Sequence, residues 1–207
     1  IIGLLFTIKL PNPVQEKELK PGTTRQIISK NKFLFLSLLL RHIGAAAVWV
    51  ILPIMIMEKW GGDLYHISVV YVANTLTAFI LMNVMASKIH LSNITKFKIG
   101  IGATTFVFVG LAFVTDWWMA MPFMSLVGAT WAFLFIGGNF HLMENNPRST
   151  STGIFSSTLS IATVIGPIVG GTIAFLFDYV AVLYFAVAII VCAFVVSLKI
   201  ENKKILS

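Results

Sequence analysis

Long apolar segments alternate with short polar segments along the chain. The apolar segments are 33–57, 67–87, 97–115, 118–143, 152–177 and 180–198. Each has 19 to 26 residues, and a helix needs about 20 residues to cross a hydrocarbon core of about 30 Å. Membrane-spanning strands would instead show short stretches of alternating polar and apolar residues, whereas 180–198 is apolar on every face. The pattern therefore predicts an all-α membrane protein with six transmembrane helices.

Composition supports this interpretation. Hydrophobic residues make up 57% of the chain and charged residues 11%, whereas about a quarter of the residues in a soluble domain are charged. The mean hydropathy is +0.91. The chain has one cysteine, Cys192, in the middle of the last apolar segment. An intrachain disulfide is therefore excluded, and we expect Cys192 to act as a small apolar residue.

Positive charges lie on one side of the expected membrane. Of the 15 Lys and Arg residues, all but Lys59 fall in or beside alternate gaps between the apolar segments. Cytoplasmic loops carry an excess of Lys and Arg, so we expect a plasma-membrane protein with both ends of this segment in the cytoplasm. Topology and attraction to the anionic headgroups of the lipid bilayer account for the net charge of +7, and we expect no nucleic-acid partner.

The N-terminal region differs from the rest of the chain. Positions 1–8 are apolar but too short to cross a bilayer, and they lack the features of a signal peptide. We expect 1–8 to be the end of a preceding transmembrane helix, 9–32 a cytoplasmic linker, 33–198 the six-helix bundle and 199–207 a cytoplasmic tail. The chain would then be the C-terminal part of a longer protein. A complete small protein is the alternative.

Polar side chains are unevenly distributed among the six segments. They are sparse in 97–115 and 180–198 and more frequent in the other four, which indicates two three-helix repeats. Polar groups are costly in hydrocarbon, so they should face the bundle interior or a wet cavity. The candidates for lining a substrate cavity are Trp49, Tyr71, Asn74, Trp131 and Asn139. For Ser and Thr, hydrogen bonding to the backbone one turn back is the stronger alternative.

A glycine–proline motif occurs in 152–177. Gly166 and Gly170 share one helix face and, with Gly171, predict close packing against a neighbouring helix. Pro167 predicts a bend near Thr163, because proline removes a backbone donor and clashes with the preceding turn. A bend beside a close contact is a candidate pivot for a conformational change. A static kink with good packing is the alternative.

The residues around this motif resemble the penultimate helix of the major facilitator superfamily and the loop before it. The resemblance is carried by Pro147, Arg148, Gly153, Ser157, Gly166, Pro167, Gly170 and Gly171. The start of 33–57 resembles the seventh helix of that family, at Asn31, Lys32, Phe33, Leu34, Arg41, Gly44 and Pro53. One departure is the loop 86–92, which lacks the Asp-Arg or Gly-Arg pattern often found there in the family.

The resemblance implies half of a twelve-helix transporter fold, with the missing N-terminal half as a partner. The first, second, fourth and fifth helices would line the central cavity, and the third and sixth would lie outside. The implied function is a secondary active transporter, of permease or efflux type, that moves a small-molecule substrate by alternating access. Coupling to a proton or to sodium is open, because no carboxylate lies deep in any segment.

Arg41 and Arg148 are candidates for positive charge at the inner mouth of such a cavity. Arg41 lies about two turns inside the first segment, and extension of its side chain to the lipid headgroups is the favoured alternative.

Enzymatic chemistry is not expected. His42, His66, His90 and His141 are scattered, and none has a histidine or carboxylate four residues away. We therefore expect no catalytic residues, no cofactor and no metal site. The alternative functions are a non-transporting membrane receptor or assembly subunit, and a homodimeric half-transporter.

Overall fold

The computed structural model describes residues 24–87, 89–144 and 146–201. The expected transmembrane end at 1–8, most of the linker and most of the tail lie outside the described residues. The described part is helical throughout: α2 (Thr24–Lys30), α3 (Lys32–Glu58), α4 (Leu64–Ser87), α5 (Asn93–Leu111), α6 (Trp117–Met143), α7 (Arg148–Leu176) and α8 (Tyr179–Leu198). The last six are long and apolar enough to cross a membrane. The prediction of an all-α, multi-pass membrane protein is confirmed.

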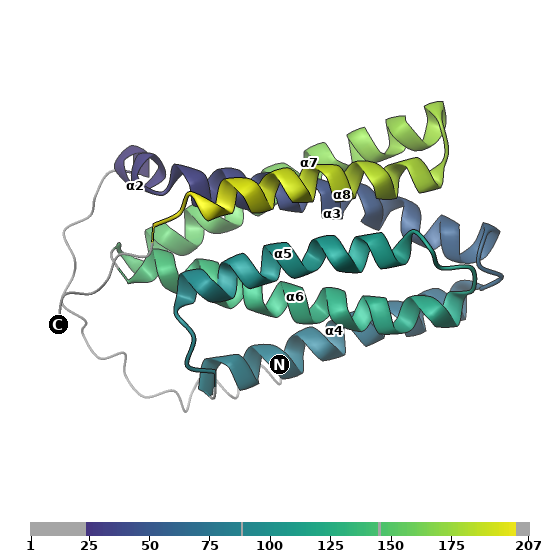
Figure 1. Ribbon diagram of the computed structural model, residues 1–207, viewed down its shortest axis with the longest axis horizontal. Coiled ribbons are helices and arrows are strands. Elements are labelled where there is room, and N and C mark those ends of the chain that lie inside the picture. The colour runs from purple at the N-terminus through teal and green to yellow at the C-terminus, as the bar shows by residue number, and fades with distance from the viewer. Residues whose placement is uncertain (1–23, 88, 145, 202–207) are drawn as a thin grey trace, which may run out of the picture.

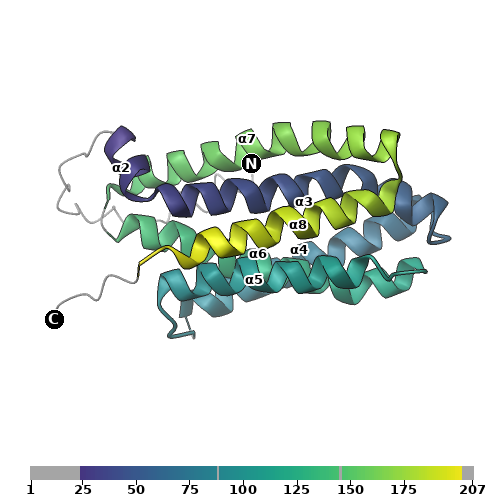
Figure 2. The same cartoon turned by 45° about the horizontal axis from the view of Figure 1, so that its top comes forward.

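The six long helices lie side by side along the long axis of the bundle, in two groups that Figure 1 shows one above the other. In one group α3 packs against α7 and α8, and in the other α6 packs against α4 and α5. Contacts between α5 and α8 join the groups, as the turned view in Figure 2 also shows. In the most apolar stretch of α3, 67% of the residues are buried, whereas the corresponding share is 11% in α4 and 17% in α7. Two helices on the flanks thus expose broad faces.

Helix boundaries differ from the predicted ones where a helix starts with polar residues. α5 begins at Asn93, because the Ser92 side chain accepts the backbone N–H of Thr95 and caps the helix. Lys96, which the predicted segment 97–115 leaves in a loop, therefore lies inside α5. Similarly, α7 begins at Arg148 directly after a proline, a residue favoured at helix starts, although the apolar pattern begins only at 152.

The expected linker contains a short helix that the sequence pattern did not predict. α2 has seven residues, and its Ile27 is buried against the main bundle. Contacts with α3 and α7 hold it there. One buried side chain thus docks the segment directly before α3 onto one end of the bundle.

Cations concentrate at one end of the bundle. At the end where α3, α5 and α7 begin, called the basic end here, the described carboxylates are Glu144 and Glu201, and the described cations are Arg25, Lys30, Lys32, Lys96, Lys98, Arg148 and Lys199. The opposite end carries Glu58, Asp63, Asp116 and Asp178, with Lys59 as its one described cation. Asp63 caps the start of α4 by accepting the backbone N–H of His66 at 3.0 Å. This hydrogen bond lowers the pKa of the Asp63 carboxyl.

Candidate functional site

Arg41 is enclosed in the interior of the bundle. It lies nine residues after the start of α3, about 14 Å along the helix, and its side chain is 2% exposed. A terminal guanidinium nitrogen donates to Thr104 Oγ1 of α5 at 3.3 Å, and Cζ lies 5.5 Å from the centre of the Trp131 ring of α6. Nε has no hydrogen-bond partner among the described residues. Extension of Arg41 to the lipid headgroups, the favoured alternative, is therefore wrong, because three helices enclose the charge.

No described carboxylate forms an ion pair with Arg41. An uncompensated charge inside a membrane bundle is costly, because its water of hydration is lost without replacement. Thr104 and the face of Trp131 supply a neutral acceptor and a cation–π contact, which replace part of that hydration. Packing alone does not require a guanidinium at this position, so Arg41 is the strongest candidate for a functional group.

His42 of α3 lies against α6 and α7. Its ring centre is 5.5 Å from that of Trp131, and its Nε2 is 3.4 Å from Thr163 Oγ1. The Thr163 hydroxyl oxygen also lies 2.9 Å from the carbonyl oxygen of Leu159. His42 Nδ1 is buried and has no hydrogen-bond partner among the described residues.

Aromatic side chains extend this cluster across several helices. Trp131 lies 5.4 Å from Phe135, and Phe135 meets Phe155 of α7 edge-to-face at 5.6 Å, as measured between ring centres. Trp49, about 10 Å along α3 from His42, lies 5.4 Å from the ring of Tyr71 on α4. The five residues Trp49, Tyr71, Trp131, Phe135 and Phe155 are called the aromatic wall here. It presents apolar, polarisable surface from α3, α4, α6 and α7.

Three of the five predicted cavity residues thus lie in the aromatic wall. Tyr71 donates its hydroxyl to the Trp49 carbonyl at 3.2 Å, which fixes α4 against α3. Asn74 lies one turn further along α4, is half-buried, and has its backbone against Gly128 of α6. Asn139 lies about 12 Å beyond Trp131 on α6. It is 5% exposed, and its Oδ1 has no described partner.

Two hollows of the bundle lie away from the predicted cavity residues. None of the five lines the pocket at the basic end or the apolar groove between α5 and α6. Their role in a substrate cavity stays a prediction. Arg148, the second predicted cation, is exposed at the start of α7 on the basic end, whereas Arg41 is buried inside the bundle.

The glycines of α7 divide into two classes. A Cβ added at Gly166 would lie 2.5 Å from Ala46 Cβ and 2.8 Å from the Ile43 carbonyl oxygen of α3. At Gly170 it would lie 2.5 Å from the carbonyl oxygen of Ala47. At Gly171 nothing lies within 4 Å of the added atom. Gly166 and Gly170 therefore permit backbone contact with α3, whereas no described residue packs on Gly171, whose packing role stays a prediction.

Pro167 does not interrupt α7, which runs as one helix from Arg148 to Leu176. Its neighbour Gly166 is buried against α3, while Pro167 itself is half-buried. The proposed pivot therefore has the close contact that it requires, and motion about it stays a prediction.

The site includes residues that the sequence did not single out as candidates, namely Thr104, Phe135, Phe155 and Thr163. His42 is the second titratable residue of the first apolar segment beside Arg41, and it shares its helix face with Trp49. Thr104 is one of three threonines in an otherwise bland segment, but its pairing with Arg41 is a tertiary contact. Two phenylalanines among the 17 in the chain carry no distinguishing signal.

Comparisons with known proteins do not identify the chain: no protein-family model matches it, and no curated protein matches it.

Proposed function

We propose that the chain is one half of a secondary active transporter, of the major facilitator type, that moves a small solute by alternating access. The enclosed Arg41 is the observation that carries the proposal. Ionisable groups inside membrane bundles mark substrate or ion pathways by default, because their burial is otherwise selected against. Here the group lies beside the aromatic wall and His42, where a bound solute would meet charge and apolar surface together.

The exposed faces of α4 and α7 support a second half as partner. Exposed polar side chains of the spanning helices concentrate there: Ser68, Thr75 and Asn83 on α4, and Ser156, Ser157, Ser160, Thr163 and Thr172 on α7. By contrast, the most exposed side chain of α5 within its span is Phe106, and the exposed side chains of α8 are apolar apart from Tyr184. Polar faces favour contact with protein or water, whereas apolar faces favour lipid. In the proposal α4 and α7 face the second half, and α5 and α8 face the bilayer.

The pairing of helices supports an internal repeat. When α3, α4 and α5 are exchanged for α6, α7 and α8 respectively, the pattern of major helix contacts stays the same. The α3–α7 contact maps onto α6–α4, α3–α8 onto α6–α5, and α5–α8 onto itself. Such reciprocal pairing is expected when two three-helix units are related by a pseudo-twofold axis, as in transporters that rock about a central site.

The charge distribution supports an orientation in the plasma membrane. In the proposal the basic end is cytoplasmic, because Lys and Arg are retained on that side, and the end with Glu58, Asp63, Asp116 and Asp178 is external. Both ends of the chain then lie in the cytoplasm.

The site favours one class of solute. Arg41 offers a buried cationic donor, and cations would be repelled by it. The aromatic wall offers stacking surface. We therefore propose a solute with an aromatic or apolar body and an anionic or strongly accepting group.

The test is uptake by the full-length protein in proteoliposomes, with a panel of aromatic carboxylates and aromatic amines. We expect flux of carboxylates, and we expect Trp131→Ala and Asn74→Ala to change the order of preference within the panel. Phe106→Ala, a substitution at a side chain 78% exposed on α5, is the matched control and should change nothing.

Wild-type affinities of both wall variants for every solute would contradict the cavity assignment. A receptor or assembly subunit would bind solutes without flux. A homodimeric half-transporter would show flux and purify as a dimer of six-helix chains.

A further inference from the structure

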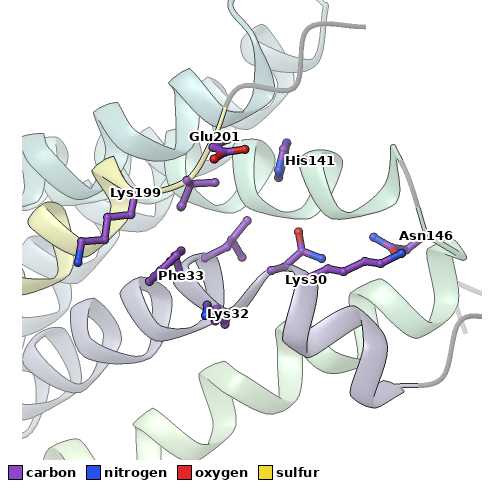
Figure 3. A pocket seen from close by; sticks show the side chains of 10 residues that line it. Lys30, Lys32, Phe33, His141, Asn146, Lys199 and Glu201 are labelled. Atoms are coloured by element: carbon purple, nitrogen blue, oxygen red, sulfur yellow. The ribbon is translucent and has the colours of Figure 1, made fainter.

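A pocket of about 490 Å³ opens at the basic end, between the start of α3 and the ends of α6 and α8. Figure 3 shows its lining from these three helices and the segment before α3. The polar and charged side chains around it are Lys30, Asn31, Lys32, Lys199, His141, Asn146 and Glu201. It is separate from Arg41 and the aromatic wall, and the proposed transport cycle makes no use of it.

We propose that this pocket binds the phosphate group of an anionic phospholipid.

Two of its lysines converge on one aromatic ring. The Nζ atoms of Lys32 and Lys199 lie 5.1 and 5.8 Å from the centre of the Phe33 ring, although the two residues come from different helices. No described carboxylate forms an ion pair with Lys30, Lys32 or Lys199. Figure 3 shows the Phe33 ring between the two lysines. Cations gathered at one pocket repel each other, so an anion bound in the pocket is favourable.

The one carboxylate in the lining does not neutralise these lysines. In Figure 3 Glu201 lies beside His141, while the Lys30 side chain extends towards Asn146 on the other side of the pocket. The Lys98 ammonium, which comes from α5, donates to the Ile200 carbonyl oxygen at 2.8 Å and holds the segment after α8 in place. The pocket therefore combines several cationic donors with a fixed wall.

The position of the pocket favours a lipid over a soluble phosphate. Lys32 is the first residue of α3, and Lys199 directly follows the last residue of α8. Both therefore lie at the depth of the lipid headgroups. One turn into the membrane from Lys32 is Leu36, which is 43% exposed, and one turn from Lys199 is Val195, which is 53% exposed. Acyl chains can lie along these apolar side chains while the phosphate contacts the lysines.

The test is native mass spectrometry of the delipidated full-length protein with added phosphatidylglycerol, phosphatidylcholine or glycerol 3-phosphate. We expect phosphatidylglycerol to bind more tightly than phosphatidylcholine. In K32Q/K199Q the affinity for phosphatidylglycerol should fall roughly thirtyfold, because each lysine near an anionic lipid contributes a factor of about five. K32R/K199R should retain binding. R25Q/K59Q removes the same charge outside the pocket and should bind as the wild type.

Equal binding by K32Q/K199Q and R25Q/K59Q, or equal affinities for the two lipids, would overturn the proposal. If glycerol 3-phosphate bound as tightly as phosphatidylglycerol, with the same loss in K32Q/K199Q, the lipid assignment would fall. Thermal unfolding of K32Q/K199Q without lipid, compared with K32R/K199R, separates lost binding from lost folding.

Discussion

Gly166→Leu in the full-length protein should abolish transport and lower thermal stability, while the chain still inserts into the membrane. A side chain at this position meets Ala46 Cβ at 2.5 Å and the backbone nitrogen of Ala47 at 2.9 Å. Backbone atoms cannot rotate away as a flexible side chain can, so α7 must separate from α3. Overpacking of this kind typically costs about 1–3 kcal/mol in the free energy of unfolding. Gly170→Leu should behave in the same way, because it meets the backbone of Ala47.

The matched control is Gly171→Leu, next to Gly170 on the same helix but with no atom within 4 Å of an added Cβ. The measurements are thermal unfolding in detergent and uptake in proteoliposomes. Equal losses of stability and uptake in Gly166→Leu and Gly171→Leu would show that the effect comes from a change in helix propensity and not from contact with α3. Unchanged uptake in Gly166→Leu would refute the pivot.

Arg41→Met should leave folding intact and reduce transport at least tenfold. Methionine fills a similar volume without a charge, and replacement of a buried, unpaired charge by an apolar residue is often neutral or stabilising. The transport loss follows from the removal of a charged hydrogen-bond donor, worth about 1.5–3 kcal/mol to a bound anion. Arg41→Lys should restore only part of the rate, because lysine lacks the planar guanidinium that meets both Thr104 and the face of Trp131.

The control for overall charge is Arg25→Gln, because Arg25 is exposed at the basic end and is not a candidate for the cavity. It should transport close to the wild-type rate. Two results would contradict the account of Arg41: wild-type transport by Arg41→Met, or a Tm of that variant well below the wild-type value. The second result would assign the guanidinium to structure.

The six spans were predictable because a membrane helix must be apolar over its whole length, whatever its neighbours. Their ends were less predictable. The Ser92 cap places Lys96 inside α5, whereas the apolar pattern begins only at 97. α2 was missed because one buried residue, Ile27, gives no periodic pattern in seven residues.

Features of the site that depend on spacing within one helix could also be predicted from the sequence. A spacing of four residues places Gly166 and Gly170 on one face, and that face meets α3. Gly171 was included because of the family motif, although it points about 100° away from Gly170 around the helix.

The environment of Arg41 could not be predicted from the sequence. Its burial depends on Thr104 and Trp131, which come from helices far along the chain, and a single sequence does not show which helix faces pack together. For the same reason Gly100 and Gly137 were not selected, although each meets the backbone of the other's helix. Periodicity identifies a face of a helix but not its partner.

The most direct test of the account is the sidedness of the two ends of the bundle in intact cells. Single cysteines are introduced in a Cys192→Ser background as Lys30→Cys, Lys199→Cys, Lys59→Cys and Asp178→Cys, and are treated with a membrane-impermeant maleimide. We predict labelling of the Lys59→Cys and Asp178→Cys proteins from outside, and of the Lys30→Cys and Lys199→Cys proteins only after permeabilisation. Labelling of the Lys30→Cys and Lys199→Cys proteins from opposite sides of the membrane would contradict a bilayer crossed six times with the basic end in the cytoplasm.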